Sequence, residues 1–487
     1  MQLGNRGGHM FTIVGKTFFR VIGFIAILGL AGPVTISLHG APLSGNTLTL
    51  QEAIHIALQQ NPDLLLAANR SRSSEITWEK QRGSFLPDLS LSSSGNRQAG
   101  KSVDPVSGDY TASAYTRFSL NLSSSLTLFN GFANTSSLHQ TRENRDAAQA
   151  ELSRTRQGVV FSVTNEFVRS LTARSFVSVE KENHKAQENL LKQISAFFEA
   201  GRRSVADLYQ QQAEIAASEY RLQEAERAYQ EAAIALLQSL GRDPGMDILL
   251  QEPAVDEMVK SLQVILDDHS ASAENIPDRP DIAAGENRVA AARYAVRAAR
   301  SGYYPRLSVS AGVGSSYSSA IPGSDLEDQL LDRNLSASIS LNLAVPLFDR
   351  GLTRQEVAAA KIQLDNEQVT LARRRRQVTA EVRQARLNWE SASRQLASAN
   401  TQLKYAGAAL NSVEDRYRAS TATLSEVSQS RALYRQARYN HVAARYTLLL
   451  RGLEILYSRG DEENLLALVT ESAMDDAAAP ATQGEHE

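Results

Sequence analysis

The ionisable side chains of this chain are not spaced as catalysis or metal binding requires. Its 487 residues include eight histidines. Four of them have no second histidine at a metal-ligand spacing, namely His55, His139, His184 and His441. No glycine-rich phosphate-binding loop is present. We therefore expect a protein that is not an enzyme and that binds no cofactor or metal.

The composition narrows the class of protein further. The net charge is −3, and no basic patch with interleaved aromatic residues indicates a nucleic-acid partner. The run of arginines over 373–376 lies inside a helical pattern and is interpreted as a solvated helix face. The chain has no cysteine, which excludes disulfides, thiolate metal sites and a lipid-modified N-terminal cysteine.

The N-terminal segment has the order of a secretory signal peptide. Lys16 and Arg20 precede an apolar stretch over 21–31, Pro33 breaks it, and small residues follow through Ala41. A transmembrane anchor is the alternative, but the stretch is shorter than the roughly 20 residues that a helical span needs. We assign residues 1–44 to a signal peptide and leader, so we expect the mature chain to be exported.

A series of short motifs occurs twice, at an offset near 218 residues, as from Pro62 to Pro280. The pairs are Asn61-Pro62-Asp63 with Arg279-Pro280-Asp281, Leu86-Pro87-Asp88-Leu89-Ser90 with Tyr304-Pro305-Arg306-Leu307-Ser308, Leu128-Phe129-Asn130-Gly131 with Leu347-Phe348-Asp349-Arg350-Gly351, and Ser239-Leu240-Gly241 with Ser458-Arg459-Gly460. Such an internal duplication indicates one architectural unit used twice. We expect repeats over 45–242 and 278–460, an equatorial linker over 243–277, and an acidic, disordered tail over 461–487.

Two proline-free stretches predict long helices over 132–198 and 352–418. At 1.5 Å per residue each would be about 100 Å long, so we expect an elongated molecule. In the second stretch, small and large apolar residues recur in two heptad columns: Val378, Ala385, Ala392, Ala399, Ala406 and Val413, and Val382, Trp389, Leu396, Leu403, Leu410 and Tyr417. This seam favours coiled-coil pairing over a single amphipathic helix packed on a core.

A return helix follows each long helix. Apolar residues spaced by seven run from Leu208 to Leu236 and from Val427 to Ile455. Each repeat therefore contains an antiparallel helical hairpin, over 131–241 and 351–458. The tips of the hairpins fall near 199–205 and 418–424.

Ahead of each helical hairpin the hydrophobic period falls to two residues. Apolar residues alternate with Ser, Asn and Thr from Phe118 to Leu128 and from Leu335 to Val345. The pattern predicts two β-hairpins, over 86–129 and 305–347. Their loops, near 95–113 and 314–334, are rich in Gly, Ser and Asp.

These strands fit two interpretations. One is a small soluble sheet with one wet face, and the other is part of a transmembrane β-barrel with its apolar face outward. Lipid tolerates no open strand edge, and about eight strands are the fewest that close a barrel. Four strands from one chain therefore span a membrane only if several chains share one barrel.

The motifs, in their order, duplication and spacing, resemble those of TolC-type outer-membrane efflux proteins, the outer-membrane factors. The resemblance includes the opening from Leu48 to Ile54 and covers about residues 46–460. It implies a mixed α/β membrane protein: a homotrimer with a 12-stranded outer-membrane β-barrel, four strands from each chain, continued by a coiled-coil α-barrel in the periplasm. It also implies three kinds of partner: a periplasmic adaptor (membrane fusion protein), an inner-membrane pump and outer-membrane lipid.

The resemblance further implies a periplasmic mouth that the hairpin tips close. Glu426 takes the first acidic position of this constriction, and Gln429, one turn later, departs from the second carboxylate of the family. Ala422 stands where the best-known member has a linking arginine. Asp207 and Tyr417 match a family pair that bridges hairpins, so they are the candidate latch.

Two classes of function fit these patterns. The first is a passive exit duct of a tripartite efflux or type I secretion system, located in the outer membrane and reaching into the periplasm. The second is an elongated periplasmic adaptor or scaffold whose strands form a soluble domain. The two classes differ in whether the strands face lipid.

Overall fold

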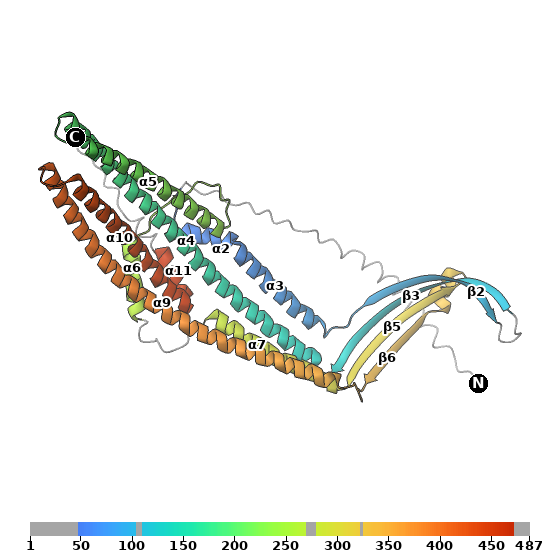
Figure 1. The fold of residues 1–487 in the computed structure, drawn as a ribbon. Coiled ribbons are helices and arrows are strands. Elements are labelled where there is room, and N and C mark those ends of the chain that lie inside the picture. The colour runs from blue at the N-terminus through green and yellow to red at the C-terminus, as the bar shows by residue number, and fades with distance from the viewer. Residues whose placement is uncertain (1–46, 104–109, 269–278, 322–324, 472–487) are drawn as a thin grey trace, which may run out of the picture. The chain divides into compact units, whose positions relative to one another are not determined.

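The computed structural model describes residues 47–103, 110–268, 279–321 and 325–471 (Figure 1). They divide into two compact units. The strand unit comprises residues 80–136 and 297–357, and the helical unit comprises the described residues of 44–79, 137–296 and 358–487. The signal peptide expected over 1–44 lies outside the described residues.

The strand unit is built around one antiparallel sheet. Its strands are β2 (Ser90–Val103), β3 (Tyr110–Asn130), β5 (Arg306–Ser318) and β6 (Ser336–Ala344). They lie in the order β2-β3-β5-β6 (Figure 1). The β2–β3 and β5–β6 hairpins thus join through β3 and β5, and β2 and β6 are the edges of the sheet.

The strands extend into the segments that were expected to be loops. β2 pairs with β3 as far as Val103, and β5 pairs with β3 as far as Ser318. The prediction of loops over 95–113 and 314–334 is therefore wrong for these paired segments, because backbone pairing does not require an alternating side-chain pattern. The β5–β6 connection folds into α8 (Leu326–Asp328) and η3 (Gln329–Arg333).

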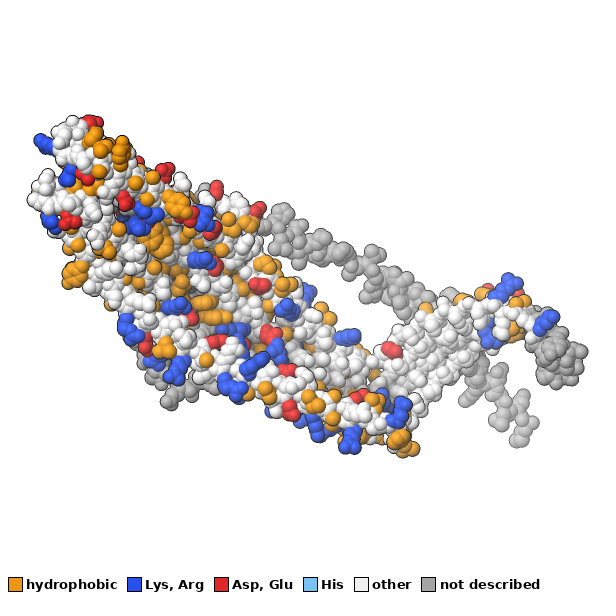
Figure 2. All heavy atoms as spheres, viewed as in Figure 1, with side chains coloured by type: hydrophobic (Ala, Val, Ile, Leu, Met, Phe, Trp, Pro, Cys, Tyr) orange, Lys and Arg blue, Asp and Glu red, His pale blue; other side chains and the backbone are white. Residues whose placement is uncertain are grey.

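The pairing register sorts the side chains of the sheet onto two faces. The polar face is mainly Ser, Asn and Gly and includes Ser92, Asn121, Ser123, Ser310, Ser338 and Ser340. The apolar face includes Leu91, Leu120, Leu122, Val309, Ile339 and Leu341. In Figure 2 the middle of the sheet is mostly white on the side turned to the viewer, as the polar face should be, and coloured side chains gather at its far end.

A β-bulge interrupts this alternation near the end of β3. Thr127 pairs with Ser308, but Phe129 rather than Leu128 pairs with Leu307. Leu128 is the extra residue of the bulge, so the alternation predicted through Leu128 stops at Thr127. Because a bulge redirects the side chains that follow it, Phe129 continues the apolar face.

The helical unit contains most of two helical hairpins. α4 (Ala133–Glu199) and α9 (Leu352–Arg418) have 67 residues each. α5 (Val205–Ser239) and α10 (Leu424–Arg459) return beside them (Figure 1). Both long helices lie where the proline-free stretches predicted them. Among the described residues, no helix is long and apolar enough to cross a membrane.

The predicted heptad seam of α9 faces its return helix. The small column is buried at Val378, Ala385, Ala392 and Ala399. In the large column Trp389 and Leu396 are half-buried, whereas Gln395 is exposed. A Cβ built on Gly452 of α10 would lie 2.9 Å from Trp389 and 2.8 Å from Leu262, so only glycine permits this close approach.

Shorter elements complete the helical unit. They are β1 (Thr47–Leu48), α2 (Leu50–Gln60), α3 (Pro62–Gly83), β4 (Leu249–Leu250), α6 (Val255–Asp268), α7 (Pro280–Ala299) and α11 (Glu462–Glu471), with η2 (Arg300–Tyr303) following α7 in the strand unit. β1 pairs with β4 in parallel. β4 and α6 occupy the expected linker.

The expectation of a disordered tail from residue 461 is wrong for its first part. Residues 462–471 form α11, which packs on α6, α10 and α2. Leu465 and Leu468 are buried there. Their apolar spacing stabilises a short helix once a core is available, although the acidic composition of the tail as a whole suggested disorder. Residues 472–487 lie outside the described residues.

The junction between α5 and α3 is closed by one amide side chain. Asn61 Nδ2 donates to the Ser239 carbonyl at 2.7 Å, while its Oδ1 accepts from the N–H groups of Asp63 and Leu64 at 2.9 and 3.2 Å. Gly241 ends α5 in the left-handed region, with φ +71°. The amide thus caps one helix start and one helix end together.

The corresponding junction between α10 and α7 uses a buried guanidinium. Arg279, which is fully buried, donates to the Ser458 carbonyl at 2.8 Å, to Glu381 at 2.7 Å and to Asp281 at 2.8 Å. Arg374 also contacts Asp281, at 2.5 Å. Burial opposes the charge of Asp281, but the two arginines outweigh it and hold the pKa of this carboxyl below its usual value.

Candidate functional site

The candidate site lies at the tips of the two helical hairpins. Each tip turns through a left-handed residue: Gly201 after α4, with φ 70°, and Ser420 after α9, with φ 64°. The N–H groups of this residue and the next donate to carbonyls of the last helical turn at 2.8–3.0 Å. This is the Schellman arrangement, which glycine adopts without strain and serine does not.

Glu426 is part of a capping box at the start of α10. Its Oε2 accepts from the N–H of Thr423 at 2.7 Å, and Thr423 Oγ1 accepts from the N–H of Glu426 at 3.3 Å. The hydrogen bonds from Thr423, with a smaller contribution from Arg416, hold the pKa of the Glu426 carboxyl below its usual value. Gln429, one turn later, is exposed. The carboxylate therefore caps the helix while its other oxygen lies 3.5 Å from Arg416.

At the start of α5 the cap is simpler. Ser204 Oγ accepts from the N–H of Asp207 at 3.2 Å, and no return bond from the Asp207 carboxylate completes a box. The Asp207 carboxylate is thus not committed to capping. This leaves it available for the latch that the sequence predicts.

An apolar cluster joins the two tips. It draws on all four hairpin helices and consists of Leu190, Ile194, Tyr417, Ala422, Leu424 and Val427, with Leu208 and Val413 at its margin. Ala422 fills a buried position in this cluster. The tips are therefore held first by apolar burial.

Tyr417 sits in this cluster with its ring beneath a guanidinium. The guanidinium carbon (Cζ) of Arg203 lies 4.3 Å from the centroid of the Tyr417 ring. Burial raises the pKa of Tyr417, and Asp207 raises it further against the opposing effect of Arg203. Among the described residues the buried Tyr417 hydroxyl has no hydrogen-bond partner. The two latch residues are brought into one neighbourhood, but the hydrogen bond expected between them is not formed within this chain.

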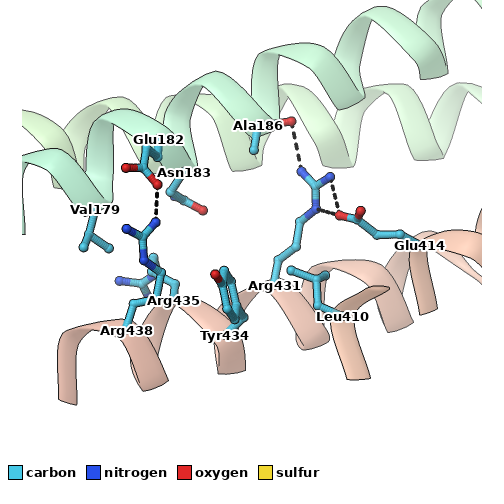
Figure 3. A pocket seen from close by; sticks show the side chains of 10 residues that line it. All are labelled: Val179, Glu182, Asn183, Ala186, Leu410, Glu414, Arg431, Tyr434, Arg435 and Arg438. Atoms are coloured by element: carbon cyan, nitrogen blue, oxygen red, sulfur yellow. Dashed lines mark hydrogen bonds and ion pairs between the residues drawn. The ribbon is translucent and has the colours of Figure 1, made fainter. Parts of the chain in front are cut away.

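A row of three arginines on α10 forms polar contacts between the hairpins near their tips (Figure 3). Arg431 donates to Glu414 of α9 at 2.7 Å and to the Ala186 carbonyl of α4 at 2.9 Å. We call Arg431, Arg435 and Arg438 the arginine row. Because they are spaced by four and three residues, they share one face of α10.

The other two arginines of the row pair with carboxylates on α4. Arg438 pairs with Glu182, and Arg435 lies 3.1 Å from Glu180, whose side chain is 1% exposed. Arg221 of α5 approaches Glu180 at 3.8 Å. A small pocket of about 200 Å³ lies along the row between α4, α9 and α10. The row thus binds both long helices to α10.

The arginine row was not predicted from the sequence. The spacing of Arg431, Arg435 and Arg438 was visible, but it also fits a solvated face. What makes these residues a link is the position of Glu180 and Glu182 on another helix, about 250 residues away in sequence. Such long-range pairing has no local signature.

Comparisons with known proteins agree with this fold. The family model described as "Outer membrane efflux protein" matches residues 53–242 and 274–455. The chain is 25% identical over 393 residues to the pyoverdine export outer membrane protein OpmQ of Pseudomonas putida, covering 79% of this chain and 80% of that protein. It is 26% identical over 423 residues to protein CyaE of Bordetella pertussis, covering 85% and 84%.

The fold is also that of a solved outer-membrane channel. The structure of CmeC from Campylobacter jejuni superposes with a TM-score of 0.72 at 18% identity, covering 87% of this chain and 89% of that one. The two stretches matched by the family model make up more than half of the 487 residues. This chain therefore belongs to the outer membrane efflux protein family, whose members are outer-membrane channels that work with adaptor and inner-membrane pump partners.

Proposed function

We propose that this protein is a homotrimeric exit duct of a tripartite efflux or type I secretion system. Each chain contributes four strands to a 12-stranded transmembrane β-barrel, and its two hairpins to a periplasmic helical barrel. The duct conducts substrates passively from a periplasmic adaptor and an inner-membrane pump to the exterior. The paired motifs and the twofold match of the family model support an internal duplication.

The observation that carries this proposal is a sheet that one chain cannot satisfy. Its apolar face is exposed, with Ile339 82%, Leu341 68% and Leu91 56% accessible. Its edge strands, β2 and β6, have no further strand beside them among the described residues. Exposed apolar area of this kind marks a contact with lipid or protein, and an open edge is not tolerated in lipid. Pairing β6 of one chain with β2 of the next removes the open edges, and lipid around the closed barrel covers the apolar face.

Aromatic residues bound the apolar face in a way that supports a membrane span. Phe118 pairs with Tyr317 near the end of β5, and Phe129 packs edge-on against Phe132 near the end of β3, with 5.3 Å between centroids. From Phe118 to Phe129, strand β3 covers about 37 Å. A tilt of about 45° reduces this to roughly 26 Å, close to the apolar band of about 25 Å in outer-membrane barrels.

The hairpin tips provide the residues of a gate. In a trimer Glu426 occurs three times around the axis, and we propose that these carboxylates form a ring that attracts cations, with Gln429 removing a second ring of charge. The competing interpretation is that Glu426 only caps α10. The capping bonds occupy Oε2, and Oε1 has only a long contact with Arg416, at 3.5 Å, so this oxygen supports the ring.

Asp207 and Tyr417 are proposed as the latch of the closed mouth. A buried hydroxyl without an acceptor costs about 1–3 kcal/mol. The unpaired Tyr417 hydroxyl therefore supports a hydrogen bond that forms when the tips assemble, and Asp207 is the carboxylate that already acts on its pKa. The arginine row keeps the two hairpins of one chain together while the latch opens.

Cysteine cross-linking tests the shared barrel. Because the chain has no native cysteine, only the introduced residues can form disulfides. We would pair Ser340→Cys on β6 with Ser90→Cys, Ser92→Cys or Ser94→Cys on β2. Within one chain β2 and β6 are three strand spacings apart, about 14 Å, which is too far for a disulfide. Oxidation of outer-membrane fractions should therefore give covalent trimers from at least one pair.

The control pair is Ser310→Cys with Ser340→Cys, which lie directly opposite in the same chain. Oxidation of this pair should leave the mass of the monomer unchanged. Absence of cross-linked trimers from all three test pairs, together with protein in the periplasmic fraction, would favour the soluble scaffold instead.

A further inference from the structure

Beyond its aromatic pair, the apolar face of the sheet becomes basic. Arg97 and Lys101 lie on β2, and the unbroken β2–β3 register places them on the same face as Leu91. Along β2 this face begins with Leu91. Gly95 follows, which pairs with Phe118 of β3, and then come Arg97 and Lys101. The order is thus aliphatic, aromatic and cationic.

The described residues that pair with β2 beside Arg97 on this face are short and uncharged. Arg97 pairs with Thr116, and Ala99 between the two basic residues pairs with Ala114. Both basic side chains are exposed, and neither forms an ion pair with any residue in the part of the chain that the structure describes. Their charges are therefore not neutralised by a described carboxylate of the sheet.

The position of the pair identifies the kind of ligand. In outer-membrane barrels an aromatic girdle marks the boundary of the apolar band, so side chains just beyond it on the same face lie at the level of lipid headgroups. Cations there are attracted to anionic headgroups. Arginine forms bidentate hydrogen bonds with phosphate, and lysine acts on it as a point charge.

The spacing of the pair further describes the ligand. Four residues along a strand correspond to about 13 Å, too far for one phosphate to bridge. Each basic residue therefore takes its own phosphate. A lipid with two separated phosphates, or two neighbouring lipids, fits this spacing.

We propose that Arg97 and Lys101 form a binding site for lipid phosphate in the outer leaflet of the membrane. The inference rests on the proposed barrel, which places the apolar face against lipid and the β2–β3 connection outside. It assigns this edge of the sheet a role in anchoring the channel to anionic lipid.

The sheet itself offers a matched control at the same height. Arg117 of β3 pairs with Asn96, so it lies on the polar face directly beside Arg97 but points to the opposite side. Its guanidinium lies 6.0 Å from the ring of Tyr115, whose hydroxyl donates to Gln98 at 2.7 Å. Removing Arg117 therefore removes the same charge from the channel side rather than from the lipid side.

The test compares lipid binding and conductance in the full-length trimer. Native mass spectrometry in detergent would measure the affinity for diphosphoryl lipid A and for the same lipid without phosphates. Arg97→Gln with Lys101→Gln should lower affinity for the phosphorylated lipid about thirtyfold, at about fivefold for each basic residue, and leave the phosphate-free lipid unchanged. Arg97→Lys with Lys101→Arg should keep the affinity.

Arg117→Gln should alter single-channel conductance in planar bilayers and leave lipid affinity unchanged, while the Arg97/Lys101 variant should do the reverse. Equal affinity of wild type and the Arg97→Gln/Lys101→Gln variant, or an equal loss with Arg117→Gln, would overturn the site. Displacement of the lipid by millimolar inorganic phosphate would overturn the lipid assignment. A conducting wild type with unchanged lipid binding refutes only this inference, whereas a trimer that never conducts refutes the proposed channel.

Discussion

The two helical hairpins match in geometry and differ in chemistry. α4 and α9 have the same length of 67 residues, and both hairpins reverse through Schellman turns. At its junction the first hairpin uses the amide of Asn61, and the second uses the buried guanidinium of Arg279. The comparison teaches that helix length and turn geometry set the architecture, while each hairpin reaches its stability by different interactions.

The seams differ in the same way. The first hairpin buries polar pairs between α4 and α5: Gln187 with Gln211 at 2.9 Å and His184 with Ser218 at 2.8 Å. The second hairpin presents the apolar heptads of α9. Buried polar layers specify register and weaken an interface relative to apolar layers. The contact between α4 and α5 is therefore less stable than the contact between α9 and α10.

The largest expected effect lies at the junctions. Arg279→Asn would give the second junction the amide of the first, but Asp281 and Glu381 would lose their buried partner. We expect a loss of about 3–5 kcal/mol, against about 1–2 kcal/mol for Asn61→Ala, which removes only a cap. Chemical denaturation of the detergent-solubilised trimer, followed by circular dichroism, measures both. Equal losses would mean that the two junctions are equivalent in energy as well as in geometry.

The seam comparison predicts a stabilised variant. Among the described residues the buried Gln211 Oε1 has no hydrogen-bond partner. Replacing Gln187 and Gln211 together with leucine should stabilise the trimer by about 1–3 kcal/mol, whereas Gln211→Leu alone leaves the Gln187 amide unpaired and should gain less. The reverse change on α9, Leu396→Gln, should destabilise. A destabilised double-leucine variant would show that the polar layer is not the weaker seam.

The two tips differ in their helix caps. At Glu426 the charge of the carboxylate and its capping role can be tested separately. Glu426→Gln keeps the capping box but removes the charge, whereas Glu426→Ala removes both. Planar-bilayer recordings should show lower cation selectivity in both variants, and only the alanine variant should loosen the start of α10. Unchanged selectivity in Glu426→Gln would assign the carboxylate to capping alone.

The same residue predicts a pH dependence. Because the pKa of Glu426 is lowered in the folded state, its charge and its capping contribution are complete above the ordinary value of 4.5 and are lost as the pH falls through the lowered value. Cation selectivity should therefore persist down to pH 4.5 and decline only below it. In Glu426→Gln the selectivity should not change over this range.

The smallest expected effect concerns the turns. Ser420 occupies the left-handed position that Gly201 holds in the first tip. Ser420→Gly should stabilise the second tip by about 0.5–1 kcal/mol, and Gly201→Ser should destabilise the first by a similar amount. Hydrogen exchange of the tip amides resolves changes of this size. Identical protection in all variants would show that the tips do not sense turn strain.

The sequence predicted the parts of this fold that local physics determines. The bounds of α4 and α9 follow from the absence of proline and from strong helix formers. The capping box was not predicted, although Thr423 and Glu426, three residues apart, have its local signature. The polar and apolar faces of the sheet follow from alternation.

Features that depend on distant partners could not be predicted. The bulge at Leu128 depends on how β3 meets Leu307 and Ser308. The helix α11 forms against α6 and α10, which its composition does not reveal. The arginine row needs Glu180 and Glu182 on another helix. For the candidate site, the sequence located Glu426, Asp207 and Tyr417 at the tips, but the unpaired Tyr417 hydroxyl depends on three-dimensional packing.

Trp389, which packs against Gly452, is an intrinsic fluorescence probe of the seam between α9 and α10. The chain has two tryptophans. Trp389 packs where Gly452 leaves room on α10, and Trp78 lies under the Arg145 guanidinium, 4.5 Å from its ring. With Trp78→Phe, the fluorescence would come from Trp389 alone, and its emission should move to longer wavelength whenever α10 separates from α9 and water reaches the indole. Separation of α10 from α9 would therefore be observable in the unlabelled protein, in real time.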